Sequence, residues 1–168
     1  MSLSVHESGV GVVVARLQAL AKCLAKAEAH CAAKKIDPAV LLGTRLFPDM
    51  FPLSRQVQLA SDFAKGCCAR LAGVDNPSYP DTEASVAELQ ERIARTIAFA
   101  QSIPVERFEG AETRMIALTI ARQPVELVGR DYLLNQALPN FYFHVTTAYA
   151  ILRHCGVELG KGDFMGRG

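Results

Sequence analysis

Tryptophan is absent from this chain of 168 residues, and aromatic residues as a whole make up only 7% of it. The 18 basic and 17 acidic side chains leave a net charge of +1, so no overall field attracts nucleic acid or an anionic membrane surface. Runs of lysine and arginine interleaved with aromatic residues, which grip phosphates and bases, are also missing. The sequence therefore predicts no nucleic-acid partner.

Long uninterrupted apolar runs are missing as well. The first apolar run, residues 10–15, is short: it ends at Arg16, whereas roughly 20 apolar residues are needed to cross a bilayer. No basic stretch precedes it, as one would in a secretory signal. We therefore predict a cytoplasmic protein with no membrane partner.

Cysteine occurs five times, and no two cysteines are spaced as a CxxC pair. The odd number and the scatter argue against a disulfide framework and against a cysteine zinc site. No histidine or lysine pattern beside Cys67 and Cys68 marks either as an activated thiolate. We expect most of the thiols to be free and buried, since free cysteine packs as a small hydrophobe.

Hydrophobic residues make up 50% of the chain and charged residues 21%, a balance typical of a globular protein. The length suits one domain spanning residues 1–168. Apolar residues recur at spacings of three and four in four stretches, as expected for helices with one buried face. These helices are predicted over residues 5–35, 52–72, 86–101 and 138–156. The core residues predicted for the first two helices are Val10, Val13, Leu17, Leu20, Leu24, Ala27 and Cys31 in the first, and Leu53, Val57, Ala60, Ala64, Cys67 and Leu71 in the second. Those predicted for the other two are Val86, Leu89, Ile93, Ile97 and Ala100 in the third, and Leu138, Phe141, Val145, Ala148, Leu152 and Cys155 in the fourth.

Local signals set some of the boundaries. Asp37 before a proline predicts the start of a short helix. Ser85 and Glu88 have the spacing of a capping box, and Glu88 also lies four residues before Arg92, the favourable order for an ion pair. Residues 47–51 form an apolar segment that contains Pro48 and ends where Pro52 opens the next helix, which predicts a fixed loop packed against the core.

Residues 112–130 have more β-branched residues and no helical stripe. Met115, Ala117 and Thr119 alternate with more strongly apolar neighbours, which predicts a small two-stranded hairpin. Four long helices with short or modest connections indicate an all-α fold, an antiparallel four-helix bundle, with this hairpin between the third and fourth helices.

The last predicted helix has an unusual number of polar residues beside its apolar stripe. Asn140, His144 and Thr147 follow one flank, and Tyr142 and Tyr149 follow the other. His144 could act as a general base or hydrogen-bonding group in a pocket, helped by Asn140 and Tyr149. The alternative is a histidine at the edge of the core that is satisfied by one hydrogen bond, with Asp49 or Gln56 as its partner.

Other candidates extend this site. Gln56 is the inward polar residue of the second helix, and Arg45 with Asp49 could bind an anionic ligand or simply pair with each other. Asn140 is either a helix cap or a pocket residue. Tyr142 is also placed in the ligand pocket. Tyr142, Phe143 and Tyr149 lie off the apolar stripe, which favours a homodimer contact or packing against the hairpin. The candidate residues are His144 and Tyr149 for catalysis, and Arg45, Asp49, Gln56, Asn140 and Tyr142 for ligand binding.

Two long stretches carry a family resemblance. Residues 35–73, KIDPAVLLGTRLFPDMFPLSRQVQLASDFAKGCCARLAG, and residues 138–164, LPNFYFHVTTAYAILRHCGVELGKGDF, resemble the DUF1993 family. That family is similar to the DinB/YfiT superfamily, whose members are four-helix bundles, often homodimeric, and many of them metal-dependent. Thiol-dependent S-transferases and some hydrolases belong to the superfamily.

The resemblance implies a test for metal. Metal-binding members hold a divalent ion with one histidine from the second helix and two, four residues apart, from the fourth. Here His144 is followed at that spacing by Ala148, and the second helix has no histidine. The remaining histidines, His6, His30 and His154, do not replace the missing ligands, so we predict no three-histidine metal site and no cofactor.

Two functions stay open. The first is an uncharacterised dimeric protein of the DinB type that binds a small molecule or acts as an accessory protein. The second is a thiol-dependent transferase or hydrolase that uses a cleft around His144. An open cleft on which Gln56, Asn140, His144 and Tyr149 converge would favour the enzyme, and side chains closed off by their neighbours would disfavour it.

Overall fold

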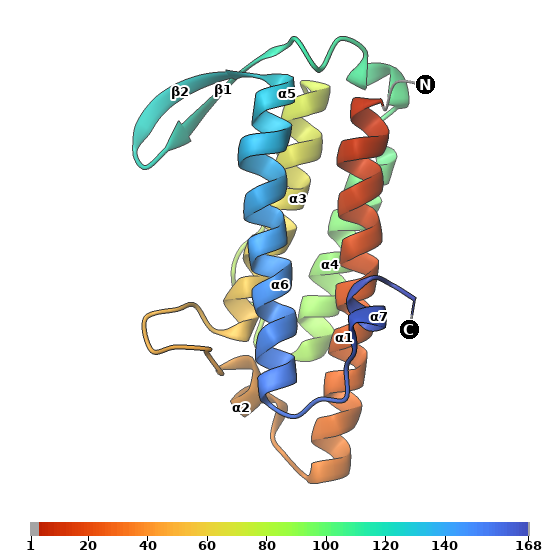
Figure 1. Cartoon of the computed structure of the whole chain (residues 1–168), viewed down its shortest axis with the longest axis vertical. Helices are drawn as coiled ribbons and strands as arrows, with labels where there is room; N and C mark the ends of the chain where they lie inside the picture. The colour runs from red at the N-terminus through yellow and green to blue at the C-terminus, as the bar shows by residue number, and fades with distance from the viewer. Residues whose placement is uncertain (1–3, 168) are drawn as a thin grey trace.

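Four long helices lie side by side along the longest axis of the molecule (Figure 1). This structure is a computed structural model, and it describes residues 4–167. The predicted span of 1–168 therefore includes four end residues, 1–3 and 168, that lie outside the described residues. The fold is mostly helical and adds one small sheet. The long helices are α1 (Val12–Lys34), α3 (Leu53–Ala72), α4 (Val86–Ser102) and α6 (Leu138–His154).

Shorter elements connect or extend these helices. Two π-helical turns, Glu7–Gly11 and Leu133–Ala137, run directly into α1 and α6. A two-stranded antiparallel sheet precedes α6. The short elements are α2 (Pro38–Leu42), a 3-10 turn (Val105–Phe108), β1 (Met115–Ile120), β2 (Gln123–Val128), α5 (Gly129–Tyr132) and α7 (Lys161–Phe164).

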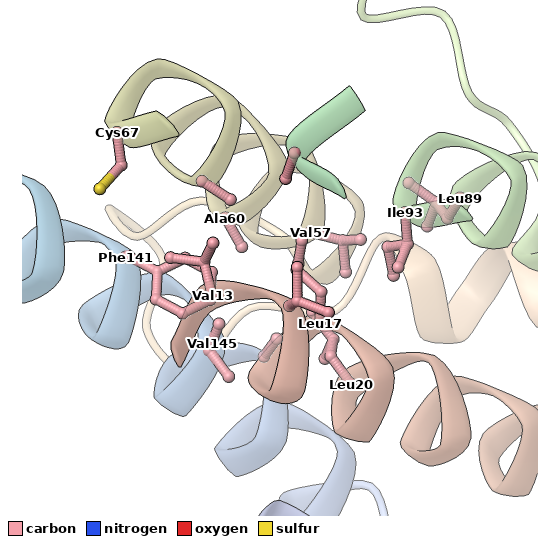
Figure 2. Close-up of a cluster of buried hydrophobic side chains, with 14 of the residues drawn as sticks. Val13, Leu17, Leu20, Val57, Ala60, Cys67, Leu89, Ile93, Phe141 and Val145 are labelled. Atoms are coloured by element: carbon pink, nitrogen blue, oxygen red, sulfur yellow. The ribbon is translucent and has the colours of Figure 1, made fainter. Parts of the chain in front are cut away.

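The core lies where the apolar stripes of the four long helices meet. Figure 2 shows side chains from all four, including Leu17, Val57, Ile93 and Phe141, in one cluster. Every residue predicted for the core of α1 and α3 is buried. In α4 and α6 the same holds except for Ile97, Leu138 and Cys155, which are half-buried. The three- and four-residue periodicity therefore identified the core correctly.

The stretch Glu7–Lys34 is long and apolar enough to cross a membrane by length and composition alone. Val13, Leu17 and Leu24 are completely buried against the other helices. Burial of this kind is typical of the core helix of a folded domain.

The predicted antiparallel arrangement is wrong for two neighbouring pairs, because α1 and α6 run in the same direction (Figure 1), and so do α3 and α4. Near their starts, Gln58 of α3 donates a hydrogen bond to Glu83, just before α4, at 2.9 Å. Near their ends, Arg107, just after α4, donates to the carbonyl oxygen of Gly73 at 2.9 Å. Residues 73–85 therefore return along the length of the helices instead of forming a short turn. These 13 residues can span about 40 Å when extended, more than the roughly 25 Å of α4.

The predicted local signals are present. The Asp37 side chain accepts from the amide of Ala39 at 2.9 Å, and Ser85 and Glu88 form the complete capping box. The ion pair between Glu88 and Arg92 does not form, because Glu88 turns back to the amides of residues 84 and 85. Arg92 is bound elsewhere, as described below.

The apolar loop after α2 is exposed, contrary to prediction. Phe47 and Phe51 are 63% and 54% exposed. Its backbone is held by its own contacts instead: the amide of Met50 donates to Phe47, and the Arg45 guanidinium donates to the Met50 carbonyl oxygen. Figure 1 shows this loop and the hairpin projecting to the same side of the molecule.

The predicted hairpin is confirmed. Residue Met115 pairs with Val128, and the register continues to Ile120 opposite Gln123. The two turn residues, Ala121 and Arg122, have φ values of 49° and 67°, the signs expected for a two-residue turn that matches strand twist.

Gly129, where the hairpin joins α5, has no room for a side chain. A Cβ atom there would lie 1.8 Å from the carbonyl oxygen of Ala111. We expect Gly129→Ala to lower the free energy of unfolding by about 2 kcal/mol or more, because the backbone must shift. Urea denaturation would measure the loss.

The matched control is Gly11→Ala at the start of α1, where nothing lies within 4 Å of the added Cβ. This change should raise the free energy of unfolding by up to about 1 kcal/mol, through helix propensity. Equal effects of the two substitutions would contradict the close approach at Gly129.

Candidate functional site

His144 of α6 and Gln56 of α3 meet at the seam between these two helices. The Nδ1 atom of His144 lies 2.7 Å from Oε1 of Gln56, and both side chains are buried. The pairing brings together residues that are 88 positions apart in the chain. Of the two partners predicted for His144, Gln56 is the one found, and Asp49 is not.

The orientation of the Gln56 amide decides which nitrogen of His144 carries the proton. Nε2 of Gln56 donates to the carbonyl oxygen of Phe51 at 3.1 Å. Oε1 therefore faces His144 and can only accept, so Nδ1 of the imidazole must donate. The hydrogen is assigned to Nδ1 by this network, and Nε2 is left with its lone pair.

Aromatic rings surround the imidazole. The ring of Phe63 stacks on His144 with centroids 5.5 Å apart, and Phe143 meets it edge-on at 5.2 Å. Burial lowers the pKa of His144 to about 4, and the positive charge of Arg55 adds to the shift. The imidazole is therefore neutral at pH 7, with an unprotonated Nε2.

The other two residues expected on this cleft lie elsewhere. Asn140 donates its side-chain amide to the carbonyl oxygen of Gln136 at 2.7 Å. It is not a helix cap, since the π turn at Leu133–Ala137 makes α6 continuous with α5. Tyr149 packs edge-on against Phe164 of α7 at 5.5 Å. Gln56 and His144 thus converge, and Asn140 and Tyr149 do not join them.

Arg45 and Asp49 are both exposed in the loop, and no ion pair between them is found in residues 4–167. Arg45 binds the Met50 backbone instead. Tyr142 lies on a different side of α6 and lines a depression of about 310 Å³ with residues of α1 and α7. The residues predicted for the ligand pocket therefore occupy four separate places: the loop for Arg45 and Asp49, and one further place each for Gln56, Asn140 and Tyr142.

Over residues 4–167, no three histidine, cysteine or carboxylate side chains are grouped so that they could hold a metal ion. At the seam, the side chains that hydrogen-bond to His144 or stack on it are Gln56, Phe63 and Phe143. An amide oxygen and two phenyl rings supply too few donor atoms for a zinc-type site.

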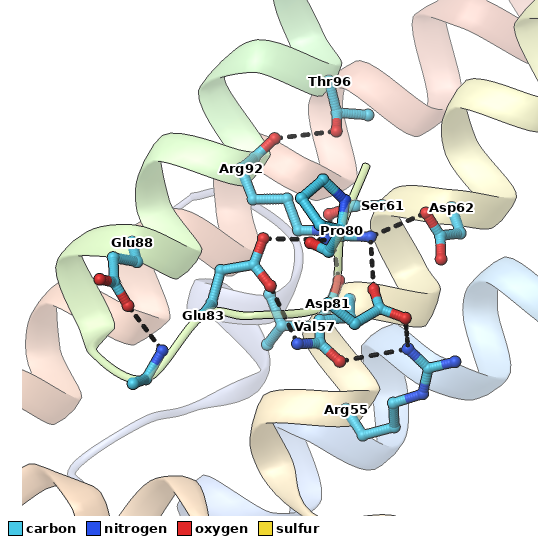
Figure 3. Close-up of polar contacts among 12 residues, drawn as sticks. Arg55, Val57, Ser61, Asp62, Pro80, Asp81, Glu83, Glu88, Arg92 and Thr96 are labelled. Atoms are coloured by element: carbon cyan, nitrogen blue, oxygen red, sulfur yellow. Dashed lines mark hydrogen bonds and ion pairs between the residues drawn. The ribbon is translucent and has the colours of Figure 1, made fainter. Parts of the chain in front are cut away.

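The most densely connected polar cluster was not anticipated from the sequence. Figure 3 shows Arg92 of α4 reaching between Asp62 of α3 and the crossover segment of residues 73–85. Its guanidinium donates to Asp62 at 2.9 Å, to Glu83 at 2.8 Å and to the Pro80 carbonyl oxygen at 3.0 Å. An ion pair with Asp81 at 3.0 Å completes the set.

Surrounding residues extend this Arg92 cluster. Gln58 and Arg92 both bind Glu83; burial opposes ionisation of Glu83, but these hydrogen bonds outweigh it and lower its pKa. The exposed Arg95 lies over the ring of Tyr79, 3.5 Å from its centroid. A sequence signal did exist, since an arginine on the flank of the α4 stripe follows an acid-rich, turn-rich segment.

The five cysteines are free, as expected, and four of them are buried. Burial raises the pKa of Cys68 to about 12 and that of Cys23 to about 11. Burial also raises the pKa of Cys67 well above its usual value. These three thiols are therefore protonated at neutral pH and are poor nucleophiles.

The fold is that of a DinB-like protein. A crystal structure described as a DinB family member protein from Shewanella denitrificans matches it with a TM-score of 0.89. The two sequences are 41% identical, and the match covers 96% of this chain and 91% of the other. No curated protein sequence matches this chain.

The family model for the domain of unknown function DUF1993 matches residues 5–165. The chain therefore belongs to the DUF1993 family, as its two long signature stretches indicated.

The lowered pKa of His144 predicts how stability changes with pH. In the unfolded chain the imidazole takes up a proton near pH 6.5, whereas in the folded chain it does so near pH 4. Stability is therefore complete above pH 6.5 and falls as the pH drops from 6.5 to 4, by about 3 kcal/mol from this group. In urea denaturation across this range, His144→Asn should lose less stability than the wild type by that amount. If the free energies of unfolding of the wild type and His144→Asn changed with pH in parallel, the lowered pKa of His144 would be contradicted.

The Arg92 cluster predicts a second stability difference. Arg92→Met leaves Asp62 and Glu83 without their main cation and should lower the free energy of unfolding by about 3–5 kcal/mol. The matched control Arg95→Met removes an exposed stacking cation from the same helix and should cost less than about 1 kcal/mol. Chemical denaturation measures both, and similar losses would show that the buried ion pairs do not hold the crossover.

Proposed function

We propose that this DinB-like chain is a small-molecule-binding protein of the four-helix-bundle type whose recognition group is the neutral imidazole of His144. The observation that carries the proposal is the hydrogen bond from His144 to Gln56, with Gln56 itself fixed by the Phe51 carbonyl oxygen. The Gln56 amide and the Phe51 carbonyl oxygen together hold the imidazole in one tautomer. The result is a lone pair on Nε2 at a fixed place among aromatic rings.

The chemistry of this group selects the ligand. A neutral Nε2 accepts a hydrogen bond and cannot donate one, so it prefers a hydroxyl, N–H or S–H group over a carboxylate. Phe63 and Phe143 offer ring surfaces beside it, which favours an aromatic neighbour for that donor. We therefore expect small aromatic alcohols or amines to be the preferred ligand class.

The alternative function, a thiol-dependent transferase or hydrolase, requires His144 to act as a general base. A general base works best when its pKa is near the working pH. The pKa of about 4 for His144 lies several units below that of a free thiol, about 8.5. Proton transfer from thiol to imidazole is therefore strongly uphill, and we favour binding over base catalysis.

A homodimer is part of the same proposal. Phe143 is 57% exposed on α6, and Phe51 of the loop accepts from Gln56, which binds the neighbouring His144. Phe51 and Phe47 are exposed as well, in the loop whose backbone carbonyl at residue 51 binds Gln56. Aromatic residues are enriched in the buried centres of protein interfaces, so a second copy is the occupant we propose. The free thiols favour a reducing compartment such as the cytoplasm.

Binding of phenol and anisole tests the ligand class. Both carry the same ring, but only phenol can donate a hydrogen bond to Nε2. We expect phenol to bind roughly tenfold more tightly than anisole, measured from imidazole shifts of His144 in nitrogen-15 spectra. His144→Phe, which keeps a ring without an acceptor, should remove the preference. Equal affinities for wild-type protein, or shifts confined to another part of the chain, would rule out the proposed site.

Sedimentation equilibrium tests the dimer. The wild-type chain should sediment as a dimer at micromolar concentration, and Phe143→Asp should weaken association by at least about tenfold because a charge is placed in an apolar interface. The control Val105→Asp changes an equally exposed apolar residue beyond the end of α4 and should leave the mass unchanged. A monomeric wild type would refute the dimer.

A further inference from the structure

A groove between α1 and α4 lies on a different part of the molecule from His144. It has a volume of about 520 Å³, within the range of small-molecule sites. Its apolar floor comes from Ala15 and Ala19 of α1 and from Ile93 and Ile97 of α4, which are spaced to face each other across two antiparallel helices. The groove is a candidate site that the function proposed above does not use.

The last turns of the chain close one side of this groove. Figure 1 shows α7 lying against α1. Arg16 of α1 donates to the carbonyl oxygens of Phe164 at 2.7 Å and Met165 at 2.9 Å. Lys26 pairs with Asp163 at 2.5 Å. The backbone of Met165 is therefore fixed, whereas its thioether side chain is flexible and can adapt to an apolar ligand.

The charge of the lining has one sign. The two ionised residues among those that line the groove are Arg16 and Lys22, and no carboxylate lines it. Over residues 4–167, neither cation forms an ion pair. The hydrogen bonds of Arg16 go to carbonyl oxygens, which do not cancel its charge. An anionic group is therefore the complementary partner.

The two cations lie toward opposite ends of the groove: Arg16, beside Ala15, is held by the carbonyl oxygens of residues 164 and 165, so we assign the anionic group to Lys22. Because α1 and α4 are antiparallel, Lys22 lies at the same end as Gln90, whereas Ala15, Ile97 and Met165 lie at the other. Seven residues of helix separate Ala15 from Lys22, a rise of about 10 Å. An extended chain of eight carbons is of similar length.

We propose that the groove between α1 and α4 binds a small amphipathic anion of the medium-chain carboxylate class. Its carboxylate pairs with Lys22 and accepts from the amide of Gln90. Its hydrocarbon chain lies on Ala15, Ala19, Ile93 and Ile97, under Met165. The proposal is independent of the His144 site, which lies between α3 and α6.

Octanoate and 1-octanol are the probes, since they share a chain and differ in charge. Calorimetric titration of the wild-type chain should show octanoate binding about tenfold more tightly than 1-octanol. Lys22→Glu should weaken octanoate about tenfold or more and leave 1-octanol within about twofold. The control Lys34→Glu makes the same charge change on the same helix outside the groove, and should alter neither affinity.

A second variant tests the apolar part. Ala94→Trp places a large side chain on the exposed wall of the groove and should weaken both probes. Amide shifts caused by octanoate should fall on α1, α4 and the segment of residues 163–167. No binding of octanoate, equal affinity of wild type and Lys22→Glu, or shifts at His144 instead would overturn the proposal.

Discussion

Four interactions of Arg92 hold the segment that crosses back between α3 and α4. With α3 and α4 running in the same direction, the intervening segment must return along the whole length of the helices. Such a segment has little apolar surface of its own, and its backbone needs partners. The guanidinium of Arg92 supplies them by binding Glu83, Asp81 and the Pro80 carbonyl oxygen while its other side holds Asp62. A buried charge with several partners can fix one arrangement against others of similar packing.

That arrangement determines which residues meet at α6. Because α3 is flanked by α4 on one side, its other side is free to pack against α6 in the opposite direction. Gln56 then faces His144, and the amide transmits the position of the Phe51 carbonyl oxygen to the imidazole. The same loop that supplies this carbonyl oxygen also exposes Phe47 and Phe51. The hydrogen-bond chain thus joins the polar seam to the aromatic surface on which we place the dimer.

Local features of the fold could be predicted from the sequence, since they depend on neighbours in the chain. The stripe through Val57 and Ala64, the Ser85 cap and the hairpin from Met115 to Val128 all follow from periodicity or turn chemistry. The direction of α4 could not, because it shows only in contacts between distant residues, such as those of Arg92 with residues 30, 11 and 9 positions away. The exposed loop was mispredicted because apolar composition does not distinguish a core-facing loop from an interaction surface.

The candidate site shows the same division. The partnership of His144 with Gln56 was one of two alternatives read from the chain, but the tautomer required the Phe51 contact, which only the folded structure reveals. Asn140 is not the helix cap that was one of its two expected roles, because a π turn continues the helix backwards from Leu138.

The central claim is that Gln56 holds His144 neutral, with the proton on Nδ1. Long-range proton–nitrogen correlation spectra of the imidazole at pH 7 test it most directly. In the wild type, the account predicts a protonated Nδ1 and an unprotonated Nε2. In Gln56→Leu it predicts a mixture of the two tautomers. A proton on Nε2 in the wild type would contradict it.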